Sequence, residues 1–172
     1  MIIAQNTKIV LRYLELSDLE ELAILANNSK IANNLRNGFK NPYNLEHAHE
    51  FYSMIQQQNP QSYFAIGYEG NFAGMIGLTK LEDVYCKTAE IGYWLGEPYW
   101  NMGLMTGAVK LVVKWGWQNL DIVRIHTGIY SHNKASARVL EKAGFKFECE
   151  FIHSIYKNGK VLNELRYSIL KP

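Results

Sequence analysis

The residues with the clearest chemical potential surround a glycine turn at residues 100–107, WNMGLMTG. A run rich in β-branched and aromatic residues precedes the turn, and apolar residues at helical spacing follow it. A turn that opens a helix leaves backbone N–H groups without partners and adds partial positive charge. Gly103 also lets the main chain approach a ligand closely. The pattern therefore predicts a site for a phosphate or pyrophosphate, with an ordinary strand-to-helix turn as the alternative.

The strands and helices that position this turn can be predicted from hydrophobic spacing and turn residues. Strands are predicted at residues 8–14, 63–69, 72–81, 88–95, 123–130, 145–155 and 163–170. Helices are predicted after a capping box at Ser17 and Glu20, at residues 45–58, after Gly103, and at residues 133–143. Residues 27–44 are expected to be a loop with a short helix near residues 31–35, and to form part of a substrate rim. This order predicts one α/β domain over residues 1–172 with a mixed, largely antiparallel sheet.

Composition and charge exclude several classes of protein. The chain has 172 residues, of which 48% are apolar and 20% charged, enough for one domain with a buried core. A net charge of +2 is too small to favour nucleic acid or an anionic membrane as a partner. No run approaches the roughly 18 apolar residues of a membrane span, and Cys86 and Cys149 are too few for a disulfide framework. We therefore expect a cytoplasmic protein that binds neither membrane nor nucleic acid.

Two long stretches of the chain resemble a known family. The sequences AEIGYWLGEPYWNMGLMTGAVKLV and VRIHTGIYSHNKASARVLEKAGF are similar to the GNAT superfamily of acyl-CoA N-acyltransferases. Within it, the chain most resembles the ribosomal-protein N-terminal acetyltransferases of the RimJ/RimL type. The segments LRYLELSDLEEL and NGKVLNELRYSIL extend the resemblance over nearly the whole chain. It implies the GNAT fold, with a bent, mostly antiparallel sheet of about seven strands and about four helices, and acetyl-CoA as co-substrate without a metal.

The resemblance assigns cofactor contacts to three places. The pyrophosphate of acetyl-CoA would lie on the glycine turn, at Trp100, Asn101, Met102, Gly103, Leu104, Met105, Thr106 and Gly107. This turn departs from the family pattern at Asn101, Met105 and Gly107, but backbone N–H groups rather than side chains make the contacts. The pantetheine arm would pair with a splayed strand near Trp94 and Leu95, where a backbone N–H would polarise the thioester. Asn133 resembles a cofactor-contacting asparagine, and a plain helix N-cap is its alternative role.

The resemblance also assigns the two proton transfers of the reaction. Many GNAT enzymes use a tyrosine to protonate the leaving thiolate, but Leu140 occupies that position here. We therefore expect Ser136, which matches a serine of RimL-type relatives, to act as the acid. For the base that deprotonates the amine we favour Glu90 over His153, although an imidazole titrates near neutral pH. Tyr156 is expected to line the acceptor site together with His153.

The acceptor, and the activity itself, leave alternatives open. The preferred hypothesis is direct attack of a primary amine, such as a protein N-terminal α-amino group, on acetyl-CoA through a tetrahedral intermediate. A polyamine or aminoglycoside is the alternative acceptor, and only Glu82, Asp83, Glu148 and Glu150 offer an acidic pocket for it. A non-catalytic CoA-binding or partner-binding module is the third hypothesis, because the turn departs from the family pattern. Small enzymes of this type are often dimers, and the sequence leaves the oligomeric state open.

Overall fold

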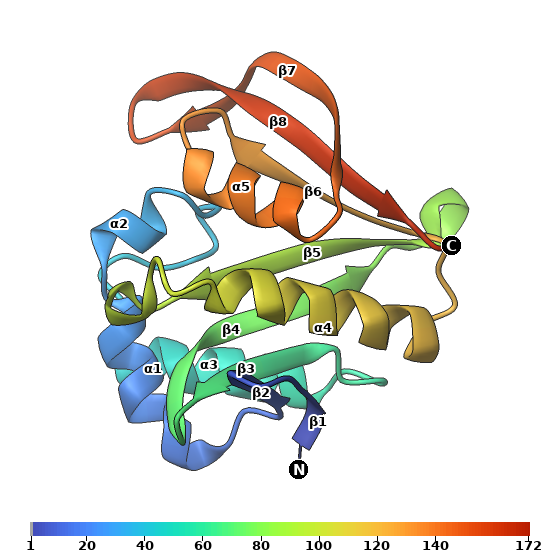
Figure 1. The fold of residues 1–172 in the computed structure, drawn as a ribbon. Helices are drawn as coiled ribbons and strands as arrows, with labels where there is room; N and C mark the ends of the chain where they lie inside the picture. Colours follow the sequence, from blue (N-terminus) through green and yellow to red (C-terminus); the bar gives the residue numbers. More distant parts are fainter. Residues whose placement is uncertain (1) are drawn as a thin grey trace.

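The computed structural model describes residues 2–172, which form one mixed sheet of eight strands with helices packed on it (Figure 1). The strands are β1 (Ile2–Gln5), β2 (Ile9–Arg12), β3 (Tyr63–Tyr68), β4 (Asn71–Lys80), β5 (Thr88–Leu95), β6 (Arg124–Tyr130), β7 (Lys146–Lys157) and β8 (Lys160–Leu170). Their order in the sheet is β1-β2-β3-β4-β5-β6-β8-β7. All neighbouring pairs are antiparallel except β5 and β6, which run parallel.

Helices pack on both faces of the sheet (Figure 1). They are α1 (Leu19–Ala26), α2 (Ser29–Ala32), α3 (Leu45–Gln56), α4 (Leu104–Asn119) and α5 (Lys134–Lys142). Helices α4 and α5 bury Val112 and Leu140 in one apolar cluster with Ile91 of β5. Helices α1 and α3 bury Leu22 and Ile55 in a second cluster. The core therefore lies in two layers, one on each face of the sheet.

Strands β5 and β6 pair only where they begin. Three residue pairs join them, from Thr88 with Arg124 to Glu90 with His126. Beyond this point β5 continues along β4 to its end, and β6 continues along β8 to Tyr130. The two strands therefore diverge, and each leaves main-chain groups that the other does not bind. This divergence is the splayed strand that the family resemblance implies.

The direction of the unpaired main-chain groups follows from the alternation along β5. The N–H of Gly96 donates to a carbonyl of β4, and the carbonyl of Thr88 accepts from the N–H of Leu81, which follows β4. Successive residues of a strand direct their main-chain groups to opposite sides, so the even-numbered residues of β5 bond to β4. The odd-numbered residues that present their groups to the gap are Ile91, Tyr93 and Leu95.

The predicted α/β class and the mostly antiparallel sheet are confirmed, with small differences in the number of elements. The strand predicted at residues 88–95 matches β5, and the helix expected after Gly103 is α4. The structure has eight strands rather than seven, because the four residues of β1 are too few to give a hydrophobic pattern. The additional helix, α2, has four residues and overlaps the short helix expected near residues 31–35.

The capping box predicted at Ser17 is wrong. Helix α1 begins at Leu19, immediately after Asp18, and no side chain caps it within the described residues. The carboxylate of Asp18 instead accepts from the guanidinium of Arg12 at 2.6 and 2.7 Å and from the N–H of Glu15 at 2.8 Å. A largely buried ion pair therefore holds the connection between β2 and α1, and the capping box of this connection lies at Glu15 and Asp18 rather than at Ser17 and Glu20.

Substitution of Gly74 by alanine is expected to destabilise the protein. A Cβ at this position of β4 would lie 2.9 Å from the Cα of Leu95 on β5, and backbone atoms cannot move aside without distorting the sheet. The free energy of unfolding, measured by urea denaturation, should fall by about 2 to 3 kcal/mol. Gly92→Ala is the matched control, because its Cβ would meet no atom within 4 Å. Equal stability of the two variants would contradict the close approach of β4 and β5.

Candidate active site

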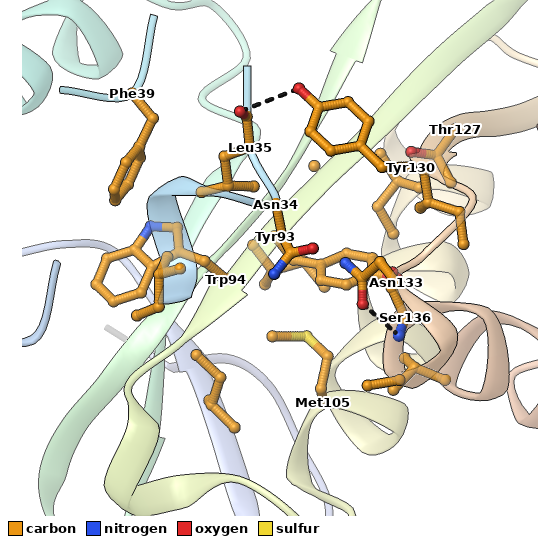
Figure 2. A pocket seen from close by; sticks show the side chains of 18 of the residues that line it. Asn34, Leu35, Phe39, Tyr93, Trp94, Met105, Thr127, Tyr130, Asn133 and Ser136 are labelled. Carbon is orange, nitrogen blue, oxygen red and sulfur yellow. Dashed lines mark hydrogen bonds between the residues drawn. The ribbon is translucent and has the colours of Figure 1, made fainter. Parts of the chain in front are cut away.

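A cavity of about 820 Å³ occupies the gap between β5 and β6. Its walls come from the two diverging strands, from the starts of α4 and α5, and from residues 30–43. Tyr93 and Trp94 are neighbours on β5 and therefore point to opposite faces of the sheet, Tyr93 towards Ser136 and Trp94 towards Phe39 (Figure 2). A cavity lined from both faces can hold two reactants that approach from opposite sides.

Ser136 and Tyr93 form a hydrogen-bonded pair on the face covered by α4 and α5. Their hydroxyl oxygens lie 2.8 Å apart, and either group can be the donor. Burial raises the pKa of Tyr93, and the bond with Ser136 opposes this only in part, so the phenol stays protonated at neutral pH. The Oδ1 of Asn133 accepts from the N–H of Ser136 at 3.1 Å. Asn133 therefore caps α5 and fixes the turn that carries Ser136 (Figure 2).

The turn before α4 leaves backbone donors free. Asn101 and Gly103 have φ values of 62° and 75°, in the left-handed region that asparagine and glycine tolerate best. Within the described residues no side chain caps α4, and the first helical bond runs from the N–H of Gly107 to the carbonyl of Gly103. The three residues between them therefore keep N–H groups without a helical partner. At the start of a 16-residue helix, these donors and the helix dipole make a site for an anion.

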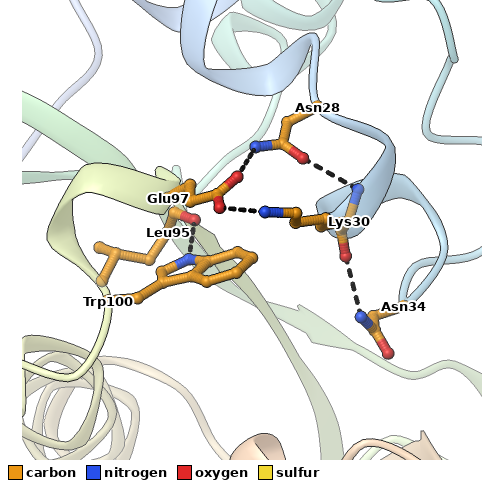
Figure 3. Close-up of polar contacts among 6 residues, drawn as sticks. All are labelled: Asn28, Lys30, Asn34, Leu95, Glu97 and Trp100. Carbon is orange, nitrogen blue, oxygen red and sulfur yellow. Dashed lines mark hydrogen bonds and ion pairs between the residues drawn. The ribbon is translucent and has the colours of Figure 1, made fainter.

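A polar cluster holds this turn against α2 (Figure 3). Glu97 accepts from the Nδ2 of Asn28 at 2.7 Å and forms an ion pair with Lys30. The bond from Lys30, followed by that from Asn28, lowers the pKa of Glu97 and keeps it ionised. Trp100 donates its indole N–H to the carbonyl of Leu95 at 2.7 Å, which joins the end of β5 to the turn.

Residues 31–38 cross the other face of the gap and are tied to both diverging strands. Arg36 forms an ion pair with Glu90 of β5. The carbonyl of Leu35 accepts from the hydroxyl of Tyr130 on β6 at 3.1 Å (Figure 2). This segment contributes to the cavity wall, as expected for the loop at residues 27–44. Aromatic side chains line the same part of the cavity: Phe39, Tyr43, Phe51, Tyr63 and Trp94.

Most of the predicted site residues line the cavity. Those that do are Glu90, Trp94, Leu95, Trp100, Asn101, Gly103, Leu104, Met105, Thr106, Asn133 and Ser136. Met102 and Gly107 are not among the lining residues, and the side chain of Met102 is exposed. Gly107 packs against the N-terminal strands, where a Cβ would come 2.8 Å from the Nδ2 of Asn6 and 3.5 Å from Ile9. Packing, rather than a ligand, therefore explains the glycine at position 107.

The structure does not bring His153 and Tyr156 to the cavity. Both are exposed on β7, whose pairing with β8 is interrupted between Phe151 and Ile155. His153 lies inside this bulge with a φ of 52°. After the bulge Ile155 turns inward and lines the cavity, so Tyr156 faces outward by alternation. A bulge cannot be located from the sequence pattern, so the sequence does not show that these two side chains lie outside the cavity.

Several cavity residues are absent from the sequence-based prediction, among them Tyr93, Arg36 and Glu164. Tyr93 could have been suggested by the strand alone, because it lies an odd number of residues from Glu90 and so on the opposite face. Arg36 gives no such signal, since 54 residues separate it from Glu90. Glu164 gives no signal in the sequence either, because the burial of its side chain depends on how β8 lies against β6.

Comparison with known proteins identifies the family. A model of the acetyltransferase (GNAT) domain matches residues 8–146, which is most of the chain. The chain belongs to this family. It is therefore an acetyl-CoA-dependent N-acetyltransferase, as the sequence resemblance implies.

Relatives of this GNAT acetyltransferase act on different amines. Spermidine N(1)-acetyltransferase of Escherichia coli (strain K12) is 26% identical over 162 residues, which are 94% of this chain and 85% of that protein. The ribosomal-protein-serine acetyltransferase of the same strain is 29% identical over 108 residues, 60% of each protein. The structure of RimL, a ribosomal L7/L12 α-N-protein acetyltransferase, in complex with coenzyme A has a TM-score of 0.88 at 22% identity, over 99% of this chain and 98% of that one. This last likeness shows the GNAT fold.

The residues present fit acetyl-CoA. The free N–H groups at the start of α4 suit a pyrophosphate, and α5 adds Arg138 and Lys142 to the lining of the cavity. Neither of these two side chains forms an ion pair within residues 2–172.

Among residues 2–172, no group of three or more His, Cys, Asp or Glu side chains could hold a metal ion. The described helices include none with the length and apolar character needed to cross a membrane.

Substitution of Gly103 by alanine is expected to weaken acetyl-CoA binding by about tenfold or more. Alanine at a φ of 75° is strained by about 1 to 2 kcal/mol, and relief of this strain would turn the N–H groups of α4 away from the ligand. Gly159→Ala is the matched control, since this hairpin glycine has a φ of 77° and, like Gly103, no atom within 4 Å of its Cβ position. Isothermal titration measures the affinity. Both variants should lose similar stability, and equal affinity for acetyl-CoA would contradict a binding role for the turn.

Proposed function

We propose that this GNAT acetyltransferase acetylates the α-amino group of a peptide or protein by direct attack of the amine on acetyl-CoA. The observation that carries the proposal is the cavity between β5 and β6, which Ser136 lines from one face of the sheet and Glu90 from the other. Acetyl-CoA supplies an acetyl group activated as a thioester. The residues of the chain must bind the carbonyl oxygen, accept a proton from the amine and return a proton to the sulfur.

Ser136 is the proposed acid for the leaving sulfur. When Tyr93 donates to the Oγ of Ser136, the proton of the serine hydroxyl is free to point into the cavity. The raised pKa of Tyr93 keeps this second donor protonated, so it can stabilise the charge left on Ser136 until water restores the proton. Tyr93 is therefore a positioning residue for Ser136.

Glu90 is the proposed base, acting through water. An α-amino group has a pKa of about 7.7 to 8.0 and is partly neutral at physiological pH, so a carboxylate already paired with Arg36 can suffice. The carbonyl oxygen would bind a main-chain N–H of β5. Of the two residues expected to provide it, the strand alternation favours Leu95, because the N–H of Trp94 is directed towards β4.

The charges of the cavity support an acceptor with a single positive charge. Both carboxylates that line it have an arginine partner: Glu90 has Arg36, and Glu164 has Arg166. A polyamine carries several positive charges and would require carboxylates without such partners. An aromatic wall, in which the rings of Phe39 and Trp94 lie 5.9 Å apart, suits an apolar side chain near the amine.

The carboxylates considered for a polyamine pocket lie elsewhere. Glu82, Asp83, Glu148 and Glu150 are not among the residues that line the cavity. Glu148 is bound by Arg124, which lowers its pKa to about 2, and Glu150 accepts from Asn163. Spermidine is still the second acceptor to test, because of the relative that acts on it.

Ser136→Ala is expected to lower kcat by on the order of a hundredfold without changing the affinity for acetyl-CoA, because it removes a proton donor and no backbone contact. Tyr93→Phe should cause a smaller fall, of about tenfold, since it removes one hydrogen bond. The assay measures release of coenzyme A with N-terminal peptides, spermidine and an aminoglycoside. Ser53→Ala, at an exposed serine of α3, is the control and should leave turnover unchanged.

The acceptor panel also distinguishes the alternatives. Preferential turnover of peptides supports the proposed acceptor, whereas preferential turnover of spermidine or the aminoglycoside contradicts it. Tight binding of acetyl-CoA without turnover of any amine favours a CoA-binding module. Unchanged kcat in Ser136→Ala would remove this residue from the mechanism and leave the acceptor assignment intact.

A further inference from the structure

Glu164 is a buried carboxylate of the cavity to which the proposed mechanism gives no task. It is 6% exposed and lies on β8, directly opposite Tyr130 of β6. Its carboxyl group lies over Gly128 of β6, because a Cβ on that glycine would come 2.5 Å from the Cδ of Glu164. Strand β6 has no partner on β5 beyond His126, so Gly128 stands at the edge of the gap. The missing side chain at position 128 thus lets a carboxylate from the next strand reach the cavity.

The two oxygens of Glu164 have different surroundings. Oε2 lies 2.9 Å from Nη2 of Arg166, whose guanidinium is placed over the ring of Phe151 at 5.2 Å. Oε1 has no hydrogen-bond partner within residues 2–172. It is also absent from the fully buried polar atoms of these residues that lack a partner, so the atom is not completely enclosed by protein. Since Glu164 lines the cavity, Oε1 is the oxygen that a ligand can reach. Arg166 therefore fixes the carboxylate while leaving one oxygen available.

We infer that Glu164 recognises the ammonium form of the acceptor amine, an inference that rests on the proposed function. An ammonium group only donates hydrogen bonds and a carboxylate only accepts them. A charge-assisted bond between such groups is roughly twice as strong as a neutral one. One available oxygen beside an aromatic wall selects an amine with a single positive charge and an apolar body.

The positions of the two carboxylates divide recognition from proton transfer. Glu90 lies where β5 and β6 stop pairing, and Arg36 binds it. Glu164 reaches the gap at Gly128, two residues beyond that point on β6, where the strands have separated. Glu164 binds the charged amine as it enters, and Glu90 receives its proton through water afterwards. Glu164→Gln should therefore raise KM for the acceptor more than it lowers kcat, and Glu90→Gln should do the reverse.

The test uses the full chain saturated with coenzyme A and two probes, phenylalaninamide and 3-phenylpropanamide, which lacks the amino group. At about pH 6.5 the α-amino group is protonated, and ligand-observed NMR titration gives the two dissociation constants. Wild type is expected to bind the amine more tightly by on the order of tenfold to a hundredfold. Glu164→Gln should bring this ratio close to one.

Gly128→Ala tests the position of the carboxylate rather than its charge. The added methyl group displaces the end of the Glu164 side chain and leaves every charge in place, so the ratio should again approach one. Gly67→Ala adds a methyl group to β3, outside the residues that line the cavity and 3.6 Å from its nearest neighbour, and it should keep the wild-type ratio. The double variant Glu164→Gln/Gly128→Ala should lose no more than either single variant, because both act through one carboxylate.

An unchanged ratio in Glu164→Gln and Gly128→Ala would overturn the inference, and so would a wild type that binds both probes equally. Glu164→Gln leaves Arg166 without its ion-pair partner. If this variant is unfolded and therefore no longer binds coenzyme A, the ratio of dissociation constants measured for Gly128→Ala decides whether the inference holds. The proposed function fails separately, when wild type transfers acetyl to no peptide. Acetylation of peptides together with an unchanged ratio would contradict only the role of Glu164.

Discussion

The end of pairing between β5 and β6 at Glu90 and His126 is the constraint on which the site depends. A buried main-chain group without a partner costs about 1 to 3 kcal/mol, so a sheet that separates in its middle must be compensated. The compensation is visible on both sides: β4 holds β5 to Leu95, and β8 holds β6 to Tyr130. At the open end the indole of Trp100 binds the carbonyl of Leu95. The main-chain N–H and C=O groups that stay unpaired in the gap are those that an amide-rich ligand can bind.

Side chains far apart in the sequence keep the two halves at a fixed separation. Residues 31–38 bind Glu90 on one strand and Tyr130 on the other. Glu97, bound by Asn28 and Lys30, ties α2 to the turn before α4. The width of the gap is thus set by contacts outside the sheet, and the position of Ser136 relative to Glu90 depends on them.

The sequence predicts the parts of this site that depend on local structure. The turn at Gly103, the strand at residues 88–95 and the cap at Asn133 all follow from neighbouring residues, and each is found where expected. Features that depend on the register between strands far apart in the sequence are not predicted. The bulge in β7 turns His153 away from the cavity, and the carboxylate of Glu164 is visible only once β8 is aligned with β6.

In the proposed mechanism the two sides of the cavity bind in different ways, and this would explain how the turn can depart from the family pattern. On the donor side the ligand groups are backbone N–H groups, which persist when side chains change, provided that the backbone angles are kept. Asn101 satisfies this condition, since asparagine tolerates its φ of 62°. On the acceptor side the proposed binding groups are side chains whose placement requires other residues, as Glu164 requires Gly128. We therefore expect substitutions there to change which amine can bind, and substitutions in the turn to leave the co-substrate the same.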